Sequence, residues 1–122
     1  TPHFTEWGSV VKKYQDSGEL LFEATSADGK LVLLLDIFHT KDSSKICPEG
    51  KYEVADYQVM ENFVANGGTM TLNSVKGYLK SGWVECKHIA GGYEFTFDLV
   101  DEFDRNVTGV ISGAVSGGVN PE

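Results

Sequence analysis

The chain has 122 residues and 41% of them are hydrophobic, which is enough for one domain with its own core. We therefore expect residues 1–122 to form a single β domain. Eighteen acidic residues against 10 basic ones give a formal net charge of −8. A field of this sign repels phosphate backbones and anionic lipid, so the composition argues against nucleic-acid binding. The longest apolar run, residues 31–35, is far shorter than the ~20 residues of a membrane-spanning helix.

The first half of the chain predicts strands at residues 9–14, 20–24 and 30–38. The last two are expected to form a hairpin, because Asp28-Gly29 is a strong turn signal between them. Residues 30–38 are apolar on both faces of the expected strand, which indicates a central strand covered on two sides, or one covered by the chain terminus.

The middle of the chain has weaker strand patterns, at residues 51–54, 69–72 and 83–87. Residues 57–66 lack alternation and are expected to form a loop or a single helical turn.

The clearest period of two lies at residues 93–99, where Tyr93, Phe95, Phe97 and Leu99 share one face. A looser alternation follows at residues 106–115. Turn signals recur about every 8–12 residues, which is typical of all-β folds. We expect an antiparallel β-sandwich or flattened barrel of about eight strands.

Two stretches of the chain resemble each other, residues 18–37 and 82–99. Each begins at a glycine, turns through a second glycine and carries an aspartate near its end, Asp36 or Asp98. The repetition indicates a fold built from two similar hairpin halves.

Catalytic motifs are absent from the sequence, and the histidines lack the paired spacing of a zinc site. Asp36 and Asp98 are the one carboxylate pair that we would nominate for hydrolysis. Their matching places favour a shared structural role at strand ends. The acidic segment at residues 101–106 is best interpreted as a turn whose side chains bond the local backbone. We expect a non-catalytic protein with no cofactor and no metal.

Aromatic side chains are the best candidates for a binding surface, because their amphipathic rings favour interfaces. Tyr93 alternates with core residues, so we expect it to be buried. Trp83, Tyr57 and Tyr78 have less decisive neighbours and are the predicted ligand-binding residues.

Cys47 and Cys86 are too few for a disulfide scaffold. In an oxidising compartment they are a candidate disulfide between neighbouring strands. The alternative is two separate thiols buried as small hydrophobic groups. Both interpretations stay open at the level of sequence.

Two segments resemble accessory outer-membrane lipoproteins of Bacteroidetes. The first is Ile46-Cys47-Pro48-Glu49-Gly50-Lys51-Tyr52, which is similar to a recurring Leu-Pro-x-Gly-x-Tyr element. The second, residues 91–109, resembles the closing hairpin of that family. It departs from the family pattern at Arg105, where glycine is usual, and at Ile111, where tyrosine is usual.

The resemblance implies an extracytoplasmic place at the outer membrane or cell surface, with a lipid anchor upstream of Thr1. No basic-then-apolar leader opens the chain, so we expect that a signal peptide has been removed. The implied partner is an outer-membrane nutrient-uptake complex, a porin with its lid protein. The family supplies no catalytic or binding residues.

The sequence thus predicts an accessory subunit that binds a glycan or peptide, or docks onto that complex. One alternative is a calycin-like barrel that encloses a small apolar ligand. Another is a hydrolase that uses Asp36 and Asp98.

Overall fold

The computed structural model describes residues 1–15, 18–39, 45–55 and 64–122, and all the regular structure in these ranges is β. None of the described residues forms a helix that is long and apolar enough to cross a bilayer. The strands are β1 (His3–Phe4), β2 (Trp7–Gln15), β3 (Glu19–Ser26), β4 (Leu31–Phe38), β5 (Gly50–Ala55), β6 (Val64–Leu72), β7 (Val75–Ile89), β8 (Gly92–Asp101) and β9 (Asn106–Gly113).

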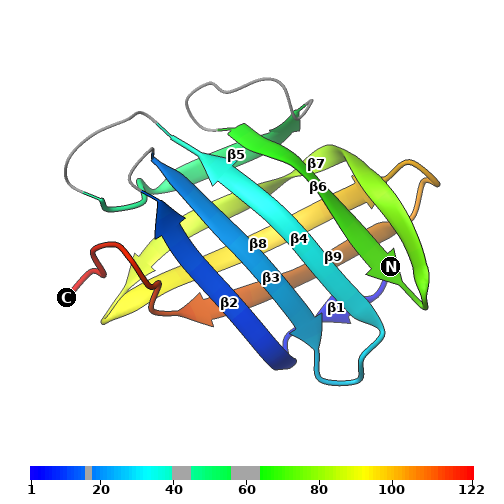
Figure 1. The fold of residues 1–122 in the computed structure, drawn as a ribbon, viewed down its shortest axis with the longest axis horizontal. Coiled ribbons are helices and arrows are strands. Elements are labelled where there is room, and N and C mark those ends of the chain that lie inside the picture. The colour runs from blue at the N-terminus through cyan, green and yellow to red at the C-terminus, as the bar shows by residue number, and fades with distance from the viewer. Residues whose placement is uncertain (16–17, 40–44, 56–63) are drawn as a thin grey trace.

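The strands form one sheet in the order β1-β9-β8-β7-β5-β6-β4-β3-β2, rolled into a nearly closed barrel. In Figure 1, β2, β3, β4 and β6 lie in front of β7, β8 and β9, and the two layers cross steeply. Such crossed layers are the orthogonal form of sheet packing. The prediction of an all-β sandwich or flattened barrel is confirmed.

The long strand β7 joins the two layers. Its first residues pair with β6, with Thr69 opposite Tyr78, and its later residues pair with β5, with Glu53 opposite Trp83. Strand β5 lies parallel to the start of β6 over residues 53–55 and 64–66. The sheet therefore bends along β7 while β8 pairs with it from Leu79 to Ile89.

Strand β9 and strand β2 meet where the barrel closes. Here the Trp7 indole N–H donates to the Val110 carbonyl oxygen at 2.8 Å, and the Lys12 ammonium donates to that of Ser112 at 3.2 Å. Beyond β9, the backbone of Ser116 bonds Tyr14 and Lys12 at 2.7 and 2.9 Å. Side chains and a short bridge thus replace a regular ladder at this seam.

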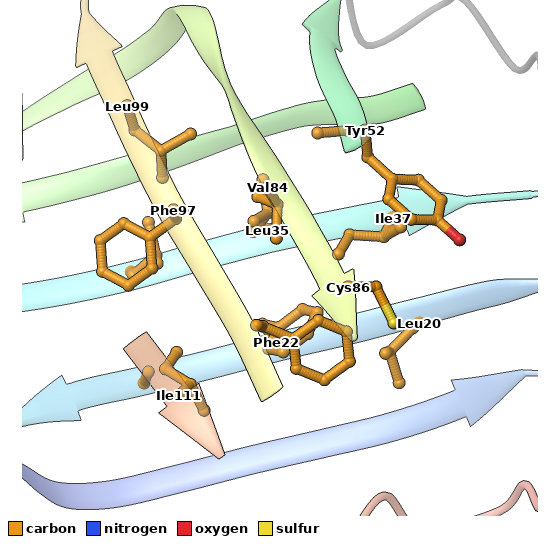
Figure 2. Packing of buried hydrophobic residues seen from close by; sticks show 14 of the residues in the cluster. Leu20, Phe22, Leu35, Ile37, Tyr52, Val84, Cys86, Phe97, Leu99 and Ile111 are labelled. Atoms are coloured by element: carbon orange, nitrogen blue, oxygen red, sulfur yellow. The ribbon is translucent and has the colours of Figure 1, made fainter. Parts of the chain in front are cut away.

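The barrel interior holds the residues that alternate inward, and Figure 2 shows several of them in contact between the layers. Phe22 of β3 meets Phe95 of β8 edge-on, with ring centroids 4.8 Å apart. Tyr93 stacks on Phe95 at 5.6 Å, and Trp7 lies 6.0 Å from Phe97. The expected burial of Tyr93, Phe95, Phe97 and Leu99 is confirmed.

Two local predictions fail. Strand β4 is not covered on both sides, because Leu34 on its outer face is 39% exposed. Of residues 57–66, the part that the structure describes, residues 64–66, belongs to strand β6 and pairs with β4. Asn66 and Gly67 interrupt the alternation of polar and apolar residues in the sequence. Polar and small residue types have little preference for either face of a sheet, so the pattern does not predict this strand.

Candidate functional site

The candidate site is on the outside of the barrel, around Trp83 of β7. Residues directly opposite in a ladder share a face of the sheet. Glu53 and Asp98 flank Trp83 in this way, Thr108 follows Asp98, and His3 follows Thr108. We call this row of five residues across β5, β7, β8, β9 and β1 the Trp83 face. At ~4.8 Å between neighbouring strands it extends for roughly 19 Å.

An irregularity in β7 sets the direction of Trp83. The register with β8 shifts between Leu79 and Ser81, and Gly82 follows with a φ of 113°. A side chain at Gly82 would overlap the backbone carbonyl of Asp98, so the close approach requires glycine there. After the bulge the alternation resumes with Val84 buried in the core, which places Trp83 outside.

The contacts on the Trp83 face are polar. The Lys51 ammonium lies 4.2 Å from the centroid of the Trp83 ring, a cation–π contact. Asp98 Oδ1 accepts a hydrogen bond from the Asn106 side-chain amide at 2.7 Å, and the same amide donates to the Leu99 carbonyl at 3.0 Å. These bonds fix the Asp98 carboxylate beside the indole and leave it accessible in part.

The far end of the row meets a shallow hollow. His3 Nδ1 and Thr108 Oγ1 are 2.7 Å apart. His3 also lines an open depression of about 180 Å³ together with Glu6, Ser26 and Asp28. The row therefore combines one aromatic surface with several side chains that accept hydrogen bonds.

Tyr78 is separate from this row. It is 65% exposed on the outer face of the opposite layer, where Thr69, Leu34 and Glu23 follow it across the sheet. Tyr57 lies outside the described residues. The structure thus places Trp83 and Tyr78 on the same strand but on different layers of the barrel.

Asp36 and Asp98 do not form a cleft. Asp36 faces outward from β4 and Asp98 faces outward from β8, strands that lie in opposite layers (Figure 1). Burial raises the pKa of Asp36. Within the described part of the chain, no group of three or more His, Cys, Asp or Glu side chains has the arrangement of a metal site.

The acidic turn at residues 101–106 is built around an ion pair between a buried carboxylate and a partly exposed arginine. Asp101 is fully buried, and its carboxylate accepts bonds from the backbone N–H groups of Phe103 and Arg105 at 3.0 and 2.9 Å. The Arg105 guanidinium donates to it at 2.9 and 2.6 Å. Burial alone would raise the pKa of Asp101, but these bonds from Arg105 and Phe103 hold it below its usual value.

Cys47 and Cys86 are both free and both fully buried in the structure. The Cys86 thiol lies 3.9 Å from the Cys47 carbonyl oxygen.

The sequence does not indicate that Glu53 and Thr108 belong to the Trp83 face, or that Lys51 lies against it. These residues are on other strands, and only the strand registers bring them to this part of the surface. The alternation along each strand predicts that these side chains face outward, but it does not predict which strands are neighbours in the sheet.

Comparisons of the chain with protein-family models, with curated proteins and with solved structures gave no match. The class that the fold and the site define is therefore a small β-barrel with an aromatic and acidic row on its outer surface.

Proposed function

We propose that this chain is a non-catalytic, extracytoplasmic binding domain that holds a neutral, linear glycan along the Trp83 face. The observation that carries the proposal is the row itself, with the Trp83 ring followed across the strands by Asp98, Thr108 and His3. A row roughly 19 Å long, at ~4.8 Å per strand, suits an extended ligand better than a compact one.

The chemistry of the row matches the two sides of a sugar ring. The face of an indole carries negative charge density, which attracts the polarised C–H bonds of a pyranose face. Glu53 and Asp98 carboxylates accept hydrogen bonds and donate none, and sugar hydroxyls donate them. A ligand rich in hydroxyl donors therefore satisfies this surface better than an extended apolar peptide.

The charge of the row favours a neutral glycan over an acidic one. Three carboxylates surround Trp83, those of Glu53, Glu85 and Asp98. Two lysines lie near them: Lys51 is over the Trp83 ring, and the Lys87 ammonium is 3.7 Å from the Glu85 carboxylate. An anionic sugar would meet this negative field and the net charge of −8.

The interior gives less support to the alternative, an enclosed apolar ligand. Phe22, Phe95, Phe97 and Tyr93 meet other aromatic rings at centroid distances of 4.8 to 6.0 Å in the space between the layers. Rings in mutual contact fill volume that a ligand would need.

The place at the cell surface rests on the resemblance of residues 46–52 and 91–109 to accessory lipoproteins of Bacteroidetes. In this chain the residues of the first element have a structural use, because the Tyr52 hydroxyl donates to the Pro48 carbonyl at 2.8 Å. We propose that the domain presents captured glycan to an outer-membrane uptake complex.

The test is a binding measurement with neutral polysaccharides and oligosaccharides, first on an array and then by calorimetry. Trp83→Ala should weaken binding at least about tenfold, because losing ring contacts costs roughly 1.4 kcal/mol or more. Tyr78→Ala is the matched control, since it removes an exposed aromatic ring from the same strand on the other layer, and it should leave affinity unchanged.

Three outcomes would contradict the proposal. One is an array that stays blank with folded protein, and another is equal affinity for Trp83→Ala and wild type. The third is selective binding of peptides, which would assign the row to a different class of ligand.

A further inference from the structure

The two cysteines of the chain meet inside one end of the barrel. Cys86 lies on β7, and Gly50, its ladder partner on β5, comes three positions after Cys47. Figure 2 shows the Cys86 side chain pointing into the core near Leu20. Its thiol lies 3.9 Å from the Cys47 carbonyl oxygen.

The segment that carries Cys47 is held in place by contacts on each side. The Cys47 backbone N–H donates to the Tyr93 hydroxyl at 3.1 Å, and the His88 ring donates to the Cys47 carbonyl at 2.7 Å. The Tyr52 hydroxyl is 3.4 Å from the Cys47 sulfur. These bonds hold the Cys47 backbone beside β7 and β8, at the place where the Cys86 thiol points inward.

The two thiols differ in acidity. In the folded protein the neighbouring Cys86 thiol lowers the pKa of Cys47 and outweighs the effect of burial, and Tyr52 acts in the same direction. The Cys47 thiol, together with burial, raises the pKa of Cys86. Before the barrel closes these influences are absent, so either thiol can attack first as its thiolate.

We propose that Cys47 and Cys86 are a modification site, an intramolecular disulfide that forms by exchange with a disulfide oxidant as the chain folds. Both thiols are fully buried in the folded protein, so the reaction belongs to the stage before this end of the barrel closes.

The exchange has two balanced steps, written here for oxidised glutathione. One protein thiolate, taken here as that of Cys47, attacks one glutathione sulfur and releases the other glutathione as a thiolate. The Cys86 sulfur then attacks the Cys47 sulfur of this mixed disulfide and releases the second glutathione. Two protein thiols are oxidised, one glutathione disulfide is reduced, and the two protons end on the released glutathiones.

The bond would fasten the segment before β5 to the middle of the sheet. That segment also holds the end of the chain, because Val119 donates to the Lys45 carbonyl at 2.9 Å and accepts a bond from the Tyr93 hydroxyl at 2.6 Å. The disulfide would thus stabilise three parts of the chain at this end of the barrel.

The experiment refolds the full chain from denaturant with either oxidised glutathione or a reductant. We expect the oxidised product to be lighter by the mass of two hydrogens and to show no titratable thiol in denaturant. Its melting temperature should be higher by roughly 10–15 °C, because a disulfide that closes the loop from Cys47 to Cys86 lowers the entropy of the unfolded chain. Reductant should reverse all three changes.

Persistence of two thiols after refolding in excess oxidised glutathione would overturn the proposal. Accumulation of a stable glutathione adduct would overturn it as well, because the second thiol would then be out of reach. Cys86→Ala should show no loss of hydrogen. Since the wild-type comparison needs no variant, the test stands even where that substitution prevents folding.

Discussion

Removal of the Arg105 side chain should strongly destabilise the protein. The guanidinium makes two bonds to the buried Asp101 carboxylate and donates to the carbonyls of Leu72 and Val75 at 3.0 and 2.8 Å. It thereby ties the β8–β9 turn to the β6–β7 turn. Arg105→Ala leaves the Asp101 charge buried and without its cation.

The expected loss is about 3 kcal/mol, the lower end of the range for removing one partner of a buried ion pair, because the Arg105 side chain is 23% exposed. At roughly 2.1 cal/mol/K per residue, unfolding 122 residues carries an entropy of about 0.26 kcal/mol/K. The melting temperature should therefore fall by roughly 12 °C. Urea denaturation followed by tryptophan fluorescence gives the free energy of unfolding directly.

The chain offers a matched control in the same turn. Lys80 and Asp104 also form an ion pair, but their side chains are 46% and 79% exposed. Lys80→Ala should cost less than about 1 kcal/mol, because exposed pairs contribute little. A loss for Arg105→Ala no larger than that of the control would refute the assignment of a structural ion pair.

Two further predictions concern the site and the pH dependence. Gly82→Ala should cost about 1–3 kcal/mol in urea denaturation and should also weaken glycan binding, because the new methyl group overlaps the Asp98 backbone beside Trp83; unchanged stability would contradict the close approach. Asp36→Asn should raise stability at pH 7 by less than about 1 kcal/mol, since folding desolvates this carboxylate and raises its pKa. In the wild type, this group makes stability fall as pH rises from about 4 through the folded pKa, and the slope should be smaller in the variant; an identical pH profile would show that Asp36 is not desolvated.

The sequence predicts the faces of the strands better than their partners. The period of two at Tyr93, Phe95 and Phe97 correctly places these residues in the core, because their large apolar side chains leave one choice of face. Trp83 and Asp98 are both candidates by residue type, yet nothing in the local sequence shows that they are neighbours. Their pairing depends on the bulge before Gly82.

Two residues near the β8–β9 turn have roles that only the structure shows. The residue with the left-handed conformation in this turn is Asp104, with a φ of 61°. Arg105 is thus free to bond Asp101. Ile111 is buried in the core.

The seam between β2 and β9 makes the order of assembly depend on both ends of the chain. Trp7 reaches Val110 across 103 positions, and Lys12 reaches Ser112 across 100. Contacts this distant in sequence form late and slow the search for the native topology. A chain that emerges from a ribosome or a translocation pore with its leading end first must therefore keep the barrel open until residues 110–116 arrive.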